Sequence, residues 1–117
     1  MHRFELPWPP TVNHYWRRVG PRTLISKEGR RFRSHVASLL ALRRIQPLSG
    51  RLDVRVTLHP PDRRRRDLDN SMKALLDALE HGGAYGDDFQ IEHLDIWRGE
   101  VVPSGKAIVQ IGQLIRS

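Results

Sequence analysis

The sequence predicts a single α/β domain of the α+β kind, in which one small β-sheet packs against two main helices. Residues 51–59 alternate apolar and polar side chains without interruption, which is typical of a half-buried strand. Residues 27–44 and the segment that ends at Gly82 instead repeat their apolar residues at helical spacing. A chain of 117 residues has room for one core, so we expect residues 1–117 to form one domain.

The N-terminal segment predicts a short strand followed by a mixed aromatic and basic stretch. Residues 2–6 alternate, and the proline-rich residues 7–10 stop the strand. Residues 13–18 then combine two aromatic rings with cations, a mixture that suits nucleic acid through stacking and phosphate pairing. Alternatively, Trp8 and the rings of this stretch cover the core while the arginines are solvated.

The first main helix is expected over residues 27–44. Residues 23–25 before it form a short strand or a turn, and Ser26 is a suitable N-cap. We expect Pro47 to end the helix. Its apolar stripe consists of Phe32, Val36, Leu39 and Leu40.

The strand at residues 51–59 is the strongest signal in the chain, and its apolar face must lie under the two helices. The second helix follows, with Asp69 or Asn70 as its N-cap and Gly82-Gly83 as its end. The inward residues of the strand are Leu52, Val54, Val56 and Leu58, and those of the helix are Met72, Leu75, Leu76 and Leu79.

The last part of the chain predicts two further strands, at residues 91–97 and 106–111. A turn through Pro103-Ser104-Gly105 joins them, so we expect a terminal hairpin.

Composition favours a polyanionic partner. The chain is 38% apolar and 28% charged, as in an ordinary globule, and its net charge of +7 suits nucleic acid. It has no cysteine, which excludes disulfides and thiolate metal sites. Its six histidines show no zinc-ligand spacing, and a Gly-rich phosphate loop is missing, so no nucleotide cofactor is indicated. With no signal peptide and no membrane-spanning run, the expected location is cytoplasmic.

The segment between the strand and the second helix carries the most specific chemistry. Four consecutive arginines, Arg63, Arg64, Arg65 and Arg66, adjoin Asp67 and Asp69. Arginines suit phosphates, and a pair of carboxylates suits a hard divalent cation. Because two carboxylates make a weak magnesium site, the Asp87-Asp88 turn is the best source of a third. The predicted chemistry is metal-assisted phosphodiester hydrolysis.

Lys73 lies one helical turn after Asp69, where an ammonium group could stabilise charge developing in the transition state. The same residues also allow structural roles. Asp69 could be only an N-cap, Asp67 could pair with Arg65 or Arg66, and Lys73 could pair with Asp77. The residues alone leave these alternatives open.

The chain also resembles the RusA family of Holliday junction resolvases. The matching motifs run in order from the N-terminus to Gln90, and the central block is highly specific. They are Leu6-Pro7-Trp8-Pro9-Pro10 with Asn13, Ser26-Lys27-Glu28-Gly29, Pro61-Asp62-Arg63-Arg64-Arg65-Arg66-Asp67-Leu68-Asp69-Asn70, Lys73, Asp77-Ala78-Leu79, and Asp87-Asp88 with Gln90.

This resemblance implies a small mixed β-sheet fold, a homodimer, and cleavage of four-way DNA junctions with Mg²⁺, or Mn²⁺ in its place. Position by position, Asp67, Asp69 and Asp88 match the metal-binding acids and Lys73 matches the catalytic lysine. DNA-binding roles are expected for Arg63, Arg64, Arg65, Arg66, Asn70, Asn13, Arg17 and Arg18. The chain departs from the family at Gly86, Val12 and His14, so a sequence preference for cleavage does not transfer.

Two other functions fit the residues. One is a DNA-binding module without catalysis, in which the acids are caps and ion-pair partners. The other is a metal-dependent nuclease that acts on flaps or single strands. A dimer favours the junction resolvase, because a two-fold axis relates two sites as the two strands to be cut are related.

Overall fold

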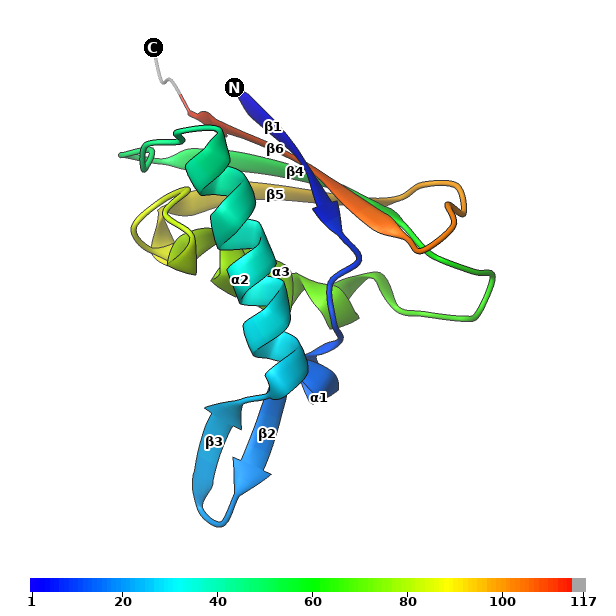
Figure 1. Ribbon diagram of the computed structural model, residues 1–117. Coiled ribbons are helices and arrows are strands. Elements are labelled where there is room, and N and C mark those ends of the chain that lie inside the picture. Colours follow the sequence, from blue (N-terminus) through cyan, green and yellow to red (C-terminus); the bar gives the residue numbers. More distant parts are fainter. Residues whose placement is uncertain (115–117) are drawn as a thin grey trace.

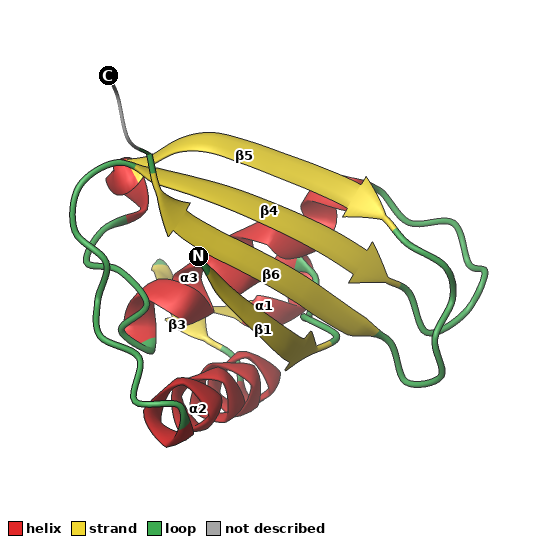
Figure 2. Cartoon of the chain, turned by 90° about the horizontal axis from the view of Figure 1, so that it is seen from above, coloured by secondary structure: helices red, strands yellow, loops and turns green. Residues whose placement is uncertain are grey.

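Four strands form one mixed sheet in the computed structural model, which describes residues 1–114. The strands are β1 (His2–Pro7), β4 (Leu52–His59), β5 (Ile91–Arg98) and β6 (Lys106–Gln113), in the spatial order β1-β6-β4-β5. β4 and β5 are parallel, and the other neighbours are antiparallel. The helices α2 (Lys27–Leu42) and α3 (Met72–His81) lie on one face of this sheet (Figures 1 and 2). The predicted α+β fold with two main helices is therefore confirmed.

The core lies between this sheet and the two helices. The four alternating apolar residues of β4 are all buried, as the sequence predicts, and they pack with the stripes of α2 and α3. Asp53, on the opposite face of β4, is also buried, and its carboxylate oxygens lie 3.3 Å from the Arg55 guanidinium and 3.1 Å from the ring of His93. Among the described residues, no helix is long and apolar enough to cross a membrane.

The predicted terminal hairpin is wrong. β5 and β6 exist, but β4 lies between them, and β6 pairs with β4 and β1. Residues 60–90, which include α3, form the long crossover that allows β5 to run parallel to β4. β6 then occupies the interior of the sheet, where its inward residues Ala107, Val109 and Ile111 are fully buried.

A second, two-stranded sheet projects from the body of the molecule (Figure 1). It is the hairpin of β2 (Trp16–Val19) and β3 (Arg22–Ile25), preceded by the short helix α1 (Val12–Tyr15). Gly20, with φ of 60°, takes the first position of the two-residue loop, where hairpin turns require positive φ. The aromatic rings cover the core: Tyr15 is buried, and Trp8 and Trp16 pack against its edge.

Both main helices end in the same backbone motif. Ser26 caps the start of α2, as predicted, by accepting a hydrogen bond from Gly29 N at 2.9 Å. The end of α2 is at Leu42, before Pro47, because Arg44 adopts φ of 52° and Ile45 N donates to Leu40 O. Gly83, with φ of 89°, has the same role after α3, which confirms the predicted glycine stop.

The two helix ends predict opposite effects of substitution. Arg44→Gly should raise the free energy of unfolding by about 1 kcal/mol, because a side chain costs about that much in the left-handed region. Gly83→Ala should lower it by about 1–2 kcal/mol through the same strain. A Cβ atom at Gly83 would meet nothing within 4 Å, so contacts contribute little to this change. Urea unfolding measures both variants, and equal signs would contradict the assignment.

Candidate active site

A cleft of about 400 Å³ lies between three segments of the chain. The first is the N-terminal segment with Trp8 and Thr11, the second is the arginine-aspartate segment after β4, and the third follows the end of β5. The lining residues of the second segment include Asp62, the four arginines, Asp67 and Asn70. The third contributes Arg98, Gly99, Glu100 and Val101. The cleft therefore combines cations with an acid of the predicted metal set.

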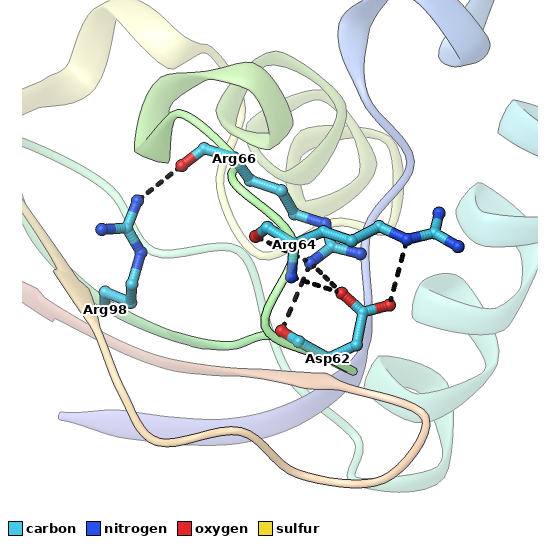
Figure 3. A network of polar contacts seen from close by, with 4 residues as sticks. All are labelled: Asp62, Arg64, Arg66 and Arg98. Atoms are coloured by element: carbon cyan, nitrogen blue, oxygen red, sulfur yellow. Dashed lines mark hydrogen bonds and ion pairs between the residues drawn. The ribbon is translucent and has the colours of Figure 1, made fainter.

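Asp62 organises the start of the basic run (Figure 3). Its Oδ1 accepts hydrogen bonds from Arg64 N at 2.9 Å and from Arg66 NH1 at 2.7 Å. The Arg64 guanidinium lies 3.8 Å from the other carboxylate oxygen. The hydrogen bond from Arg66 lowers the pKa of Asp62 to about 2. Asp62 therefore stays ionised and has a structural role.

Arg66 is held from three sides. Besides its pair with Asp62, its guanidinium lies 5.7 Å from the centre of the Trp8 ring. Its carbonyl oxygen accepts a hydrogen bond from Arg98 NH2 at 2.6 Å (Figure 3). Trp8 and Arg98 are thus parts of the cleft that sequence reasoning missed. The sequence carries no signal for Arg98, because only the fold brings the end of β5 to this segment.

Arg63 and Arg65 differ from Arg66 in having exposed side chains. Neither forms an ion pair with any residue in the described range 1–114, whereas Arg64 and Arg66 both pair with Asp62. The four arginines therefore fall into two groups: Arg64 and Arg66 are paired within the protein, and Arg63 and Arg65 are free among the described residues. The two free arginines are available for phosphate groups.

Asp67 immediately precedes a 3₁₀ turn, Leu68–Ser71, that leads into α3, and Asp69 is the second residue of this turn. Both carboxylates are exposed and accept no hydrogen bond from the described part of the chain. The predicted N-cap role of Asp69 or Asn70 is wrong. The 3₁₀ turn occupies the place of the cap, and Ser71, which immediately precedes α3, makes no side-chain cap. The alternative pairing of Asp67 with Arg65 or Arg66 is not formed either.

Lys73 lies in the first turn of α3 and is exposed. Within residues 1–114 it forms no ion pair with Asp77, although the spacing allows one. Asp77 instead accepts hydrogen bonds from Arg33, at 2.7 Å from NH2, and from the hydroxyl of Tyr15. Burial and the bond to Asp77 raise the pKa of Tyr15. Lys73 is thus free, and Asp77 is structural.

Asp88 begins a 3₁₀ turn, Asp88–Gln90, that packs beside α3. Its Oδ1 lies 2.7 Å from the hydroxyl of Tyr85, which also lies 2.8 Å from Leu76 O and shares its single proton between these acceptors. Asp88 N donates to Glu80 Oε1 at 3.3 Å. Burial and the adjacent Asp88 carboxylate raise the pKa of Tyr85. The carboxylate of Asp88 is therefore half-buried and held in place.

The donor set of Asp67, Asp69 and Asp88 has the chemistry of a Mg²⁺ or Mn²⁺ site, since all its ligand atoms are carboxylate oxygens. Two of the three acids are exposed and hold no other partner among the described residues. The structure does not bring all three together: within residues 1–114, no three His, Asp or Glu side chains are grouped to hold a metal ion. Asp67 and Asp69 precede α3, while Asp88 lies near Leu76 and Glu80, further along it.

The remaining predicted DNA-binding residues lie on three elements: the 3₁₀ turn before α3, α1 and β2. Asn70 lines the cleft beside Asp67, and Asn13 is exposed on α1. Arg17 and Arg18 are exposed on β2 of the projecting hairpin, outside the cleft.

Comparison with known proteins identifies the family to which this chain is similar. Residues 7–111 match the family model described as endodeoxyribonuclease RusA. The chain is 40% identical over 114 residues to a crossover junction endodeoxyribonuclease of Enterobacteria phage HK97, with 97% of this chain and 95% of the relative covered. It is 37% identical, at the same coverage, to proteins of that name from Escherichia coli K12 and Shigella sonnei.

Proposed function

Because this chain belongs to the RusA family of endodeoxyribonucleases and is therefore a nuclease, we propose that it resolves four-way DNA junctions by paired, metal-dependent nicks. The junction as the substrate is taken from the names of the relatives, and one observation of the structure supports the cleavage chemistry. The cleft presents free arginines and an unpaired carboxylate on one short segment, so a phosphodiester held by the cations lies beside the acid.

Each residue has a proposed role. Asp67 and Asp69 would hold Mg²⁺, or Mn²⁺ in its place, and Asp88, which lies apart from them in this structure, is the third ligand that the family resemblance implies. The chemistry that such an ion would supply there is neutralisation of charge on the phosphate and activation of water. Lys73, exposed in the first turn of α3, stabilises the charge that develops on the phosphate oxygens. Arg63 and Arg65 bind neighbouring phosphates, Asn70 contacts DNA at the rim of the cleft, and Arg66 with Arg98 keeps the segment in place.

We also propose that the active species is a homodimer. Resolution requires two nicks in strands of like polarity, and a two-fold axis supplies two copies of the site in that relation. The cleft of one copy of this chain would supply one of the two nicks.

The proposal is tested by incubating the protein with a labelled synthetic four-way junction and Mg²⁺ or Mn²⁺. We expect paired nicks on opposing strands, and none in EDTA. A linear duplex, a flap and a single strand of matching sequence are the comparison substrates. Failure to cut any junction with either ion would exclude the proposed function. Faster cleavage of flaps or single strands would replace it by the flap-nuclease function.

The division of the basic run makes a separate prediction. Arg63→Ala/Arg65→Ala should weaken DNA binding and reduce the slope of log affinity against log salt by about 2, since each phosphate contact adds about 0.9. Arg66→Ala should change this slope less, because that side chain already pairs with Asp62 and lies against Trp8. Fluorescence anisotropy in EDTA at several salt concentrations measures both. Equal slopes for the two variants would refute the division.

A further inference from the structure

The β2–β3 hairpin has two unlike faces. Residues paired across an antiparallel ladder share a face, and so do alternate residues along a strand. The pairs Arg17–Leu24 and Val19–Arg22 therefore lie on one face, which we call the arginine face. The pairs Trp16–Ile25 and Arg18–Thr23 lie on the other face. Trp16 and Ile25 are partly buried against the core, so the arginine face is turned away from it.

All four side chains of the arginine face are exposed, and it alternates cations with apolar groups. Val19 is 44% exposed and Leu24 is 36% exposed. Arg17 and Arg22 form no ion pair with any residue that the structure describes. Other exposed arginines do have such partners, for example Arg51 with Glu92 and Arg55 with Asp53. Unpaired cations beside apolar groups match the phosphate and sugar surfaces of a nucleic acid.

The root of the hairpin is firmly attached. Ser26 N donates to Tyr15 O at 2.9 Å, and Arg30 NH1 donates to Ile25 O at 3.1 Å. Gly29, in the first turn of α2, approaches so closely that a Cβ atom there would lie 2.5 Å from Tyr15 O. The hairpin is therefore a fixed arm that projects from the body (Figure 1), and its position relative to the cleft is set by the core.

The arm is continuous with the cleft along the chain. Thr11 lines the cleft, α1 follows with exposed Asn13, and β2 begins directly after α1. A two-stranded ribbon also has the width that the major groove of DNA admits. Figure 1 shows the arm projecting from the body in a different direction from the loop between β4 and α3, which carries the arginine-aspartate segment, so the arm is placed to meet DNA other than the strand held in the cleft.

We propose that the arginine face binds a second helical arm of a branched DNA while the cleft holds the strand to be cut. Arg17 and Arg22 contact phosphates, and Val19 and Leu24 lie against the sugar edge of the groove. The hairpin thereby favours a junction over a linear duplex. This inference rests on the proposed function, from which it takes the branched substrate.

The test measures binding in EDTA, where cleavage does not interfere, with a four-way junction and a linear duplex of the same arm sequences. Arg17→Ala/Arg22→Ala should reduce the salt slope on the junction by about 2 and change it little on the duplex. Arg18→Ala, on the other face, should have the smaller effect. Arg44→Asn is the control for net charge, because asparagine tolerates the positive φ at this distant helix end.

Three results would overturn the inference. In the first, the double variant keeps the wild-type preference for the junction. In the second, its affinity falls equally for the junction and the duplex. In the third, its loss of junction affinity per removed charge equals that of Arg44→Asn. Val19→Ser/Leu24→Ser supplies an independent measurement: it should reduce junction binding without changing the salt slope. If the wild type itself binds both DNAs equally, the proposed function fails as well. If the wild type prefers the junction but the double variant does not lose this preference, only the inference about the arginine face fails.

Discussion

Asp69→Asn should reduce junction cleavage by at least about a hundredfold while leaving DNA binding in EDTA intact, because it removes a proposed metal-ligand oxygen that has no structural partner within residues 1–114. Loss of one negative charge beside the basic run should, if anything, strengthen binding. A second readout is direct: titration with Mn²⁺ should show weaker metal binding by the variant.

Asp95→Asn is the matched control for this substitution. It makes the same chemical change on β5, where Asp95 lies 3.4 Å from the ring of His93. Asp95 pairs in register with Arg55 of β4, which lies between the buried Val54 and Val56 and therefore on the opposite face of the sheet. We expect its cleavage rate and metal affinity to equal those of the wild type. If Asp69→Asn cleaves as fast as the wild type, or if both variants lose the same amount of activity, Asp69 is not a metal ligand.

Asp77→Ala should lower the free energy of unfolding by about 2–3 kcal/mol, because it leaves Arg33 and Tyr15 without their shared partner inside the protein. The carboxylate joins three helices, with Tyr15 from α1, Arg33 from α2 and Asp77 itself from α3. The Arg33 and Asp77 side chains are 24% and 23% exposed, so the pair is stronger than a surface pair and weaker than a fully buried one.

Urea unfolding measures this change, and Glu92→Ala is its control. The pair of Glu92 with Arg51 is longer, at 3.9 Å, and both side chains are largely exposed, so its loss should cost about 0.5 kcal/mol or less. Equal losses of stability for Asp77→Ala and Glu92→Ala would show that the contacts of Asp77 with Arg33 and Tyr15 contribute no more than a surface ion pair.

The wild type should also lose stability above about pH 10. The unfolded chain ionises its tyrosines there, while the raised pKa values of Tyr15 and Tyr85 oppose ionisation in the folded protein.

Local order is readable from the sequence because it depends on near neighbours. The alternation in β4, the helical stripes, the Ser26 cap and the glycine stop after α3 each follow from residues a few positions apart, and the structure confirms them. The chemistry of the central segment is equally local. Four arginines beside two aspartates indicate phosphate and divalent metal whatever the fold.

The order of the strands required the tertiary structure. The last two strands are adjacent in sequence, and pairing them costs least loop entropy, yet the crossover through α3 places β5 beside β4 and leaves the interior position to β6. Hydrogen bonding between distant segments decided this, and no short window of the sequence contains that information.

The sequence by itself determined which residue types are present for catalysis and DNA binding; the tertiary structure decided which of them are free. Asp62 and Asp67 are the same amino acid, as are Arg65 and Arg66, and only geometry separates them. Asp62 holds Arg66 while Trp8 and Arg98 close around it, which leaves Arg63, Arg65 and Asp67 unpaired in the described chain. A carboxylate or a guanidinium that is already paired inside the protein is less available to bind a substrate. The contacts formed in the folded structure therefore determine the role of each charged side chain.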